Sequence, residues 1–423
     1  MLILKDLLER KEEYIFRYSI RNYEIKDKIN KLEELYNRKK VLSQELDKHR
    51  EFVNKNSKLI GKLISEKKIE EAEELKQTIG KIKKEIQEKE NILSNIEEEI
   101  FSNLIDIPNA PHISVPVGRN SKDNLIVKEK SFELNNDNLL PHWELGKKYG
   151  IIDFEAGANV CGSGFVVYKG KGAVLQRALI SFFLDKAKEK GFEEYWLPCL
   201  VNENAAFGTG QLPDKEGQMY KIENEKFYLI PTAEVPLTNL FRNIIFDEDE
   251  LPKKIVSYTP CFRREAGSYG QMVRGLNRLH QFDKVEIVII DHPKRSYNTL
   301  EEMVNYVESL VELLELPYRV VKLCGGDLGF TSAMTYDIEV YSPAQKMWLE
   351  ISSISNFEAF QANRINIKYR DKETKKNNFC HTLNGSALAL PRLVAALLEF
   401  NQCFEGIKIP KVLIPYTKFE LIN

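Results

Sequence analysis

Two segments near the start of the chain repeat apolar or long side chains at every seventh position. The repeats run through Ile25, Leu32, Lys39, Leu46 and Val53 in the first segment, and through Ala72, Ile79, Ile86, Leu93 and Ile100 in the second. A heptad repeat predicts long helices that wind around each other in a left-handed supercoil. The polar stretch between the segments contains Gly61 and predicts a reversal of the chain. We therefore predict an antiparallel two-helix rod, with helices of roughly 35 residues and about 50 Å.

The heptads alone do not say what the rod does. A dimerisation coiled coil or a spacer explains the same pattern. Lysines along the rod, such as Lys26, Lys28 and Lys31, suit contacts with a phosphate backbone, but glutamates alternate with them. On the residues alone, all three interpretations stay open.

The chain changes character after the second heptad segment. A proline-containing stretch at 103–118, NLIDIPNAPHISVPVG, ends the helical pattern. Beyond it, patterns typical of strands and of helices are mixed, which predicts an α+β body. We predict a helical domain at residues 1–104, a Pro-rich linker at 105–118 and a mixed domain at 119–423.

Composition narrows the class of protein. The chain has 423 residues, 43% of them hydrophobic, which is enough for a substantial core, and its net charge of −2 neither indicates nor excludes a nucleic-acid partner. Its six cysteines form no CxxC pairs, so we predict reduced thiols and no structural zinc. Charges at Lys5 and Asp6 interrupt the first apolar run, and no uncharged run approaches the length of about 20 residues that spans a bilayer. We therefore expect a cytoplasmic protein without a membrane span.

The segment at 257–290 carries the densest chemistry in the chain. It is typical of a strand, a polar loop and a second strand, and we expect Arg263, Glu265 and Glu286 to point into one cleft. A guanidinium suits a phosphate or carboxylate, a carboxylate accepts from an amine, and the ring of Phe282 offers a flat face to a base. This set suits a site for a nucleotide and a zwitterion. An exposed hairpin with ion pairs is the alternative.

Three other segments hold polar residues with candidate roles. In LIPTAEVPL, Thr232 and Glu234 precede a proline, a pattern that by itself is more typical of a helix start than of a binding site. In MWLEISSIS, Glu350 stands beside serine hydroxyls that suit Mg²⁺, although helix capping also explains Ser353. In GSALALPRLVAALLEF, Arg392 lies near a predicted helix start, where a cation requires an anionic partner or solvent. No P-loop or dinucleotide-binding glycine motif is present.

The string FRREAGSYGQMVRGLNRLHQFDKVE at 262–286 resembles the second signature motif of class II aminoacyl-tRNA synthetases, as found in bacterial-type seryl-tRNA synthetases. The segments at 170–200 and 381–400 resemble the first and third motifs of that class, and residues 325–364 are similar to the seryl family along their length. The resemblance implies an antiparallel sheet flanked by helices. It also implies that the rod is an arm that binds the long variable arm of a tRNA, and that residues 119–423 form the catalytic domain.

The resemblance assigns roles to individual residues. ATP contacts are implied for Arg263, Arg264, Glu265, Arg274, Phe282, Glu350, Ile351, Ser352, Ser353 and Arg392. Serine contacts are implied for Thr232, Ala233, Glu234, Arg263, Glu286 and Ser386. Arg263 and Arg392 are implied as catalytic residues, and Glu350 and Ser353 as ligands of Mg²⁺.

The activity implied by the resemblance is a ligation in two steps. ATP and L-serine give seryl-adenylate, and the seryl group then passes to tRNA(Ser), with tRNA(Sec) as a further acceptor of the family. A homodimer is implied as well. Two alternatives come from other classes: a synthetase-like ligase that charges a carrier protein, and a non-catalytic RNA-binding paralogue.

The chain departs from the family pattern at a few positions. Tyr269 and residues 271–273 replace a smaller residue and an Arg-Asp-Thr run, and Met334 stands where the family often has Lys. Ala387 and Ala389 stand where glycines are usual, and Pro391 is not a family requirement. These positions are where contacts with the substrates are expected to differ.

Overall fold

The computed structural model describes residues 1–131, 139–266 and 274–423. Within them the chain forms two compact units, one of residues 2–19 and 23–108, the other of residues 1, 20–22 and 109–423. The boundary after residue 108 lies within the predicted linker at 105–118.

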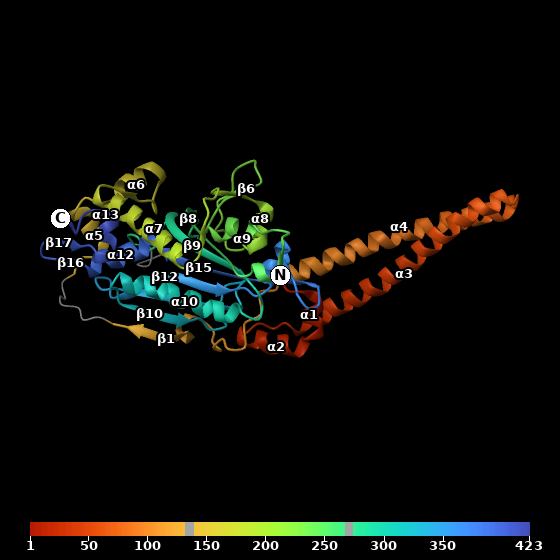
Figure 1. Cartoon of the computed structure of the whole chain (residues 1–423), viewed down its shortest axis with the longest axis horizontal. Helices are drawn as coiled ribbons and strands as arrows, with labels where there is room; N and C mark the ends of the chain where they lie inside the picture. Colours follow the sequence, from red (N-terminus) through yellow and green to blue (C-terminus); the bar gives the residue numbers. More distant parts are fainter. Residues whose placement is uncertain (132–138, 267–273) are drawn as a thin grey trace. The chain divides into compact units, whose positions relative to one another are not determined.

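The smaller unit contains the predicted pair of long helices (Figure 1). Two short helices, α1 (Leu4–Glu9) and α2 (Lys11–Ile20), precede α3 (Lys26–Ser65) and α4 (Ile69–Ile105). Heptad residues such as Leu32, Leu46, Ile79 and Ile100 are buried between the two long helices. Lys39, at a position of the first heptad repeat, forms an ion pair across the hairpin with Glu97 (2.7 Å), and Lys89 of α4 forms one with Glu45 of α3. The predicted two-helix coiled coil is therefore confirmed.

The reversal of the hairpin lies later in the chain than predicted. Gly61 is inside α3, which continues to Ser65, and the turn is at residues 66–68. Residues 53, 56, 60 and 63 are all at least partly buried, so the apolar spacing continues past the predicted end. A glycine within an exposed helix costs only about 1 kcal/mol, which this packing offsets.

An antiparallel-dominated sheet forms the centre of the larger unit, with eight strands among the described residues. In spatial order they are β1 (Leu125–Lys130), β10 (Tyr318–Lys322), β11 (Met334–Ser342), β12 (Met347–Asn356), β15 (His381–Ala389), β9 (Gln281–Asp291), β8 (Lys253–Phe262) and β4 (Glu193–Glu194). The pair of β4 with β8 is parallel, and the other neighbours are antiparallel.

The two faces of the sheet have different roles. Val285, Ile287 and Ile289 of β9 belong to the main apolar core, which α7 (Lys171–Glu189), α10 (Ser296–Leu313) and α12 (Leu390–Phe400) complete. Because side chains alternate along a strand, Lys284 and Glu286 point to the opposite face. That face carries the candidate site, and the antiparallel pairing of β8 with β9 confirms the two strands predicted at 257–290.

Smaller elements surround the sheet. The other helices are α5 (His142–Lys148), α6 (Phe154–Cys161), α8 (Glu203–Thr209), α9 (Glu234–Asn239), α11 (Phe360–Ile365) and α13 (Ile414–Thr417). The other strands are β2 (Ile152–Asp153), β3 (Val167–Tyr168), β5 (Leu200–Asn202), β6 (Phe227–Leu229), β7 (Ile245–Asp247), β13 (Lys368–Arg370), β14 (Asn377–Phe379), β16 (Gln402–Cys403), β17 (Gly406–Lys408) and β18 (Leu421–Ile422). No helix among the described residues combines the length and apolar character needed to cross a membrane.

Candidate active site

A cavity of about 530 Å³ opens on the polar face of the sheet, over β9, β15 and β12. Most of the residues predicted for the site line it. They are Thr232, Glu234, Arg263, Glu265, Phe282, Glu286, Glu350, Ile351, Ser352, Ser353, Ser386 and Arg392. The register of the strands explains part of this, because Ser386 of β15 is paired with Glu286 of β9 and both side chains leave the same face.

Three predicted residues do not line the cavity. Ala233 is buried beside it, at the start of α9. Arg264, which follows the end of β8, is exposed. The guanidinium of Arg274 lies over the ring of Trp143, 4.4 Å from its centroid. The departures at Tyr269 and 271–273 are outside the described residues.

The inner end of the cavity is a buried polar cluster. Lys284 Nζ lies 2.7 Å from a carboxylate oxygen of Glu286 and donates to the Thr232 hydroxyl at 2.8 Å. Ser386 Oγ donates to the same Glu286 oxygen at 3.2 Å, and Gln361 Nε2 donates to Glu234 at 2.6 Å. Carboxylates, a cation and hydroxyls thus surround a space that suits a small zwitterion.

Two members of this cluster were not predicted from the sequence. Lys284 is two residues before Glu286, so strand alternation alone places both on one face and would have identified it. Gln361 comes from α11 and has no local signal, because only the fold brings it to Glu234. Arg278 was also missed; it forms an ion pair with Glu265 at 2.7 Å on the cavity wall.

Glu234 has an unusual electrostatic environment. Burial raises the pKa of Glu234 to about 7, with the nearby Glu286 carboxylate as the second cause, while Gln361 and Lys284 oppose the rise. The helix-start interpretation of this segment is also correct, since Thr232 Oγ1 accepts from the Glu234 N–H at 3.1 Å. Thr232 thus lies just before Ala233, the N-cap residue of α9, and also faces the cavity.

The outer end of the cavity holds the two arginines. Arg263 follows β8, donates from Nε to the Pro231 carbonyl at 3.3 Å, and lies 5.3 Å from the Phe282 ring centroid. Arg392 is in the first turn of α12, where its guanidinium contacts two carbonyls, of Asn277 and Glu350, and the Glu350 carboxylate at 3.5 Å. The predicted need for an anionic partner at this helix start is met in part by Glu350.

Glu350 and Ser353 lie on β12, so helix capping does not explain Ser353. The pairing shifts between Ile338 and Glu339, whose partners are Ser352 and Glu350, so Ile351 is the extra residue of a bulge. Asp337, opposite Ser353, has a buried carboxylate oxygen without a hydrogen-bond partner among the described residues. Burial raises the pKa of Asp337 well above its usual range, and the nearby Glu350 carboxylate is the second cause of the rise.

These residues fit a divalent cation that is held partly by a substrate. In the described chain, no three or more His, Cys, Asp or Glu residues are grouped to hold a metal ion. Mg²⁺ typically takes one or two protein ligands and completes its shell with phosphates and water. The Glu350 carboxylate and the Ser353 hydroxyl, which both line the cavity, match that requirement.

Comparisons with known proteins agree with this geometry. Residues 219–401 match the core domain of class II tRNA synthetases, the group for G, H, P, S and T, and residues 1–111 match the N-terminal domain of seryl-tRNA synthetases. The sheet and its cavity are thus those of a class II aminoacyl-tRNA synthetase.

Full-length similarities narrow the class to one family. A serine–tRNA ligase of Salinibacter ruber is 49% identical over 375 residues, 88% of this chain and 87% of that protein. One of Methylacidiphilum infernorum is 44% identical over 423 residues, 100% of this chain and 99% of that protein. The crystal structure of seryl-tRNA synthetase from Pyrococcus horikoshii complexed with ATP has a TM-score of 0.92 at 35% identity, covering 100% of this chain and 99% of that one. The chain belongs to the seryl-tRNA synthetase family.

This membership confirms the predicted resemblance, the α+β class II fold and the enzyme class of an ATP-dependent serine–tRNA ligase. It does not favour the two alternatives, a ligase for a carrier protein and a non-catalytic paralogue.

Proposed function

We propose that the cavity binds L-serine at its inner end and ATP at its outer end and joins them. A serine carboxylate oxygen attacks the α-phosphorus, the bond to the β-phosphate breaks, and seryl-adenylate and pyrophosphate form. The terminal ribose hydroxyl of the tRNA then attacks the seryl carbonyl and AMP leaves. The observation that carries this proposal is one cavity that joins a buried polar cluster at Glu286 to the guanidinium groups of Arg263 and Arg392.

The inner cluster supplies the contacts for serine. Glu234 and Glu286 accept from the ammonium group, and Thr232 and Ser386 are available to the hydroxyl. Ala233 shapes the wall behind them. The serine carboxylate then points outward to Arg263, which also contacts the α-phosphate. Positioning of the two reactants near each other provides much of the rate.

The outer end supplies the contacts for ATP. Phe282 stacks on the adenine, Glu265 accepts from its amine, and Arg392 pairs with the γ-phosphate. Ile351 and Ser352 complete the set, with Arg274 assigned to the distal phosphates; Arg264, exposed outside the cavity, is given no contact with ATP here. Glu350 and Ser353 would hold Mg²⁺, which supplies positive charge against the phosphate oxygens.

The parts of the chain follow from these assignments. We propose residues 1–104 as the tRNA-binding domain, 105–118 as the linker and 119–423 as the catalytic domain. The acceptor is tRNA(Ser), with tRNA(Sec) as a second substrate of the same arm. The names of the related ligases and the match of residues 1–111 support a tRNA partner. A cytoplasmic location fits an enzyme that supplies charged tRNA.

The substrate is tested by exchange of pyrophosphate into ATP with each amino acid in turn. Serine should support exchange, and alanine or glycine should be poorer by on the order of 10⁴-fold, because they would leave the buried polar groups around Ser386 unpaired. Threonine should be the nearest competitor. Faster exchange with another amino acid, or none with serine, would overturn the assignment.

The raised pKa of Glu234 predicts a pH dependence for serine use. Below about pH 7 this side chain holds a proton and does not offer a negative charge to an ammonium group. The kcat/KM for serine should therefore rise as pH increases through about 7, and Glu234→Gln should remove that limb of the profile at the cost of lower activity. An unchanged limb in the variant would assign it to another group.

We also propose a homodimer formed by the catalytic domain. The supporting observation is the edge of the sheet near β4, where the large apolar side chain of Trp196 is 83% exposed. Light scattering should give twice the mass of 49.0 kDa, and Trp196→Glu should shift the population to monomers at low concentration. If shortening of the rod abolished the dimer, the interface would belong to the rod.

A further inference from the structure

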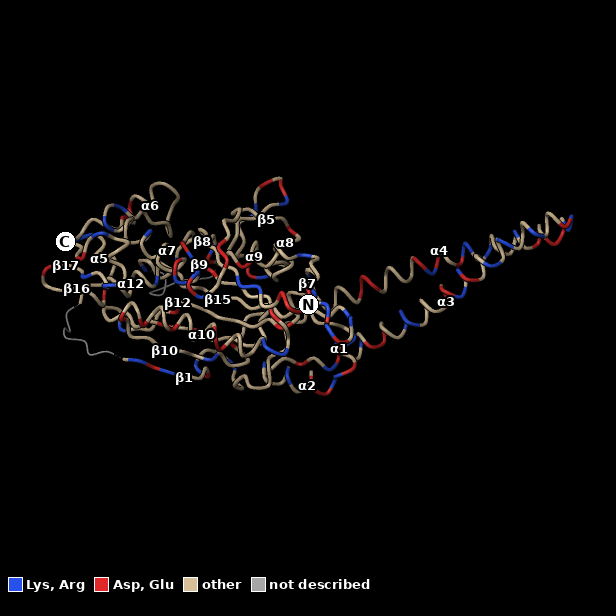
Figure 2. The backbone as a smooth tube through the Cα atoms, viewed as in Figure 1, with Lys and Arg blue, Asp and Glu red and all other residues tan. Residues whose placement is uncertain are grey.

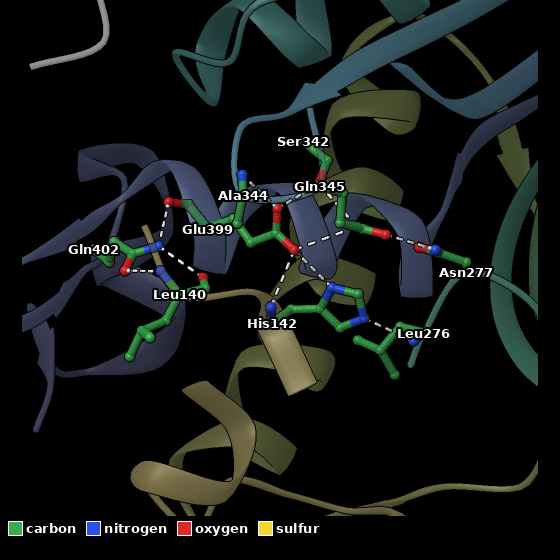
Figure 3. A network of polar contacts seen from close by, with 9 residues as sticks. All are labelled: Leu140, His142, Leu276, Asn277, Ser342, Ala344, Gln345, Glu399 and Gln402. Carbon is green, nitrogen blue, oxygen red and sulfur yellow. Dashed lines mark hydrogen bonds and ion pairs between the residues drawn. The ribbon is translucent and has the colours of Figure 1, made fainter. Parts of the chain in front are cut away.

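A buried carboxylate lies behind the candidate active site, at the far end of the helix that carries Arg392. Glu399 of α12 is fully buried. It accepts hydrogen bonds from the main chain of His142 (3.0 Å) and Ala344 (3.3 Å), and from the side chains of His142 (2.8 Å), Gln345 (3.3 Å) and Ser342 (Figure 3). These five donors supply the hydrogen bonds that a buried carboxylate requires in the interior.

The hydrogen bonds of His142 assign its tautomer. Its Nε2 atom accepts from the Leu276 N–H at 2.8 Å, so that nitrogen carries no proton. The ring proton is then on Nδ1, which donates to Glu399 at 2.8 Å. A neutral imidazole thus connects the buried carboxylate to the main chain of the segment at 274–280, which leads into β9.

The connection closes into a ring of hydrogen bonds. Asn277, next to Leu276, donates from its side chain to Gln345 Oε1 at 2.7 Å, and Gln345 Nε2 donates back to Glu399 (Figure 3). The Asn277 carbonyl accepts from Arg392 Nε at 2.9 Å. Leu276, Asn277 and Arg392 all line the cavity, so the ring ends at the site.

Two neighbouring contacts hold the same segment. Gly275 has a φ of +66° and lies against the His142 ring so closely that a β-carbon there would be 2.1 Å from Nε2. Trp143 contacts the guanidinium of Arg274 through its ring face. The His142–Trp143 pair at the start of α5 therefore contacts residues 274–276 in succession.

We infer that His142 and Glu399 are positioning residues for the adenylation step, acting through Asn277 on Arg392. The inference rests on the proposed function of the cavity. Arg392 and Glu399 are seven residues apart, two turns of α12, so both face the segment at 276–277. Loss of the ring lets that segment and the guanidinium shift together, and a shift of about 1 Å costs on the order of 100-fold in rate.

Two glutamines provide a matched test. Gln345→Ala removes the half-buried side chain that connects Asn277 to Glu399 in the ring. Gln402→Ala removes a glutamine of the same region that contacts Leu140 and the Glu399 carbonyl but is not part of the ring. In serine-dependent pyrophosphate exchange, Gln345→Ala should lower kcat by about 10-fold with the serine KM changed less than about twofold. Gln402→Ala should leave kcat unchanged and alter only Tm.

The role of the His142 ring is tested by two substitutions, each of which keeps one of its two hydrogen bonds, to Glu399 or to the Leu276 N–H. His142→Gln retains an acceptor for the Leu276 N–H, and His142→Asn retains only a donor for Glu399. We expect kcat to fall about 100-fold in His142→Asn and to be partly restored in His142→Gln. Within an Arg392→Lys background, His142→Asn should cause little further loss, because both changes act through one guanidinium.

The outcomes separate this inference from the proposed function. Failure of the unmodified chain to exchange with serine overturns the function. Normal exchange, with Gln345→Ala no worse than Gln402→Ala or with additive losses in the Arg392→Lys background, overturns the positioning role alone. Circular dichroism shows whether the His142 variants fold, and if they do not, the pair of glutamine variants decides.

Discussion

Arg263→Ala should lower the rate of serine-dependent pyrophosphate exchange by about 10²- to 10³-fold, on the order of 3 to 4 kcal/mol of transition-state stabilisation. Arg263 has a position between the two substrate ends, fixed by the Pro231 carbonyl and the Phe282 ring. The guanidinium can therefore meet both the serine carboxylate and the α-phosphate. The exchange rate of Arg263→Lys should lie between the rates of the unmodified chain and of Arg263→Ala, because lysine keeps the charge but lacks the planar guanidinium fork.

The neighbouring Arg264 is the matched control. The resemblance assigns it to ATP, but it is exposed and does not line the cavity. We expect Arg264→Ala to lower the exchange rate by less than about threefold, since the solvent screens an exposed charge outside the cavity. An equal loss in both variants would mean that Arg264 turns inward when ATP binds. Activity of Arg263→Ala near that of the unmodified chain would remove Arg263 from the site.

Shortening the rod should separate the two steps of the reaction. Residues 40–96 can be replaced by a short Gly-Ser link, because the Lys39–Glu97 ion pair (2.7 Å) shows that the flanking ends lie together. Buried residues at the base, including Leu32 and Ile100, are retained. Pyrophosphate exchange should stay within about twofold, whereas transfer to tRNA should fall on the order of 10²-fold, chiefly through a higher KM for tRNA.

The charged residues of the rod allow a second test in the full-length chain, through the salt dependence of tRNA binding. Lysines and glutamates alternate along both long helices (Figure 2). Lys55 and Lys58 are exposed on α3, and replacing both with Gln should reduce the salt dependence of tRNA binding if they meet phosphates. Undiminished charging by the shortened chain would make the rod a spacer or an assembly device.

The sequence by itself determined the elements whose signal is local. The heptads at Leu32 and Ile100 specified two helices that pack on each other, because the period of the apolar positions sets the buried stripe of a helix. The alternation along β9 placed Glu286 on the face opposite Val285, because side chains of a strand alternate. The length of α3 beyond Gly61 was underestimated, since a single glycine does not end a packed helix.

Only the tertiary structure decided which of these residues meet. Gln361 reaches Glu234 across 127 positions of the chain, and Glu399 reaches His142 across 257. Such contacts depend on the order of strands in the sheet and on the helices that cover it, and no local pattern records them. The same holds for the raised pKa of Glu234, because burial is a property of the packed molecule and not of a residue or its neighbours in sequence.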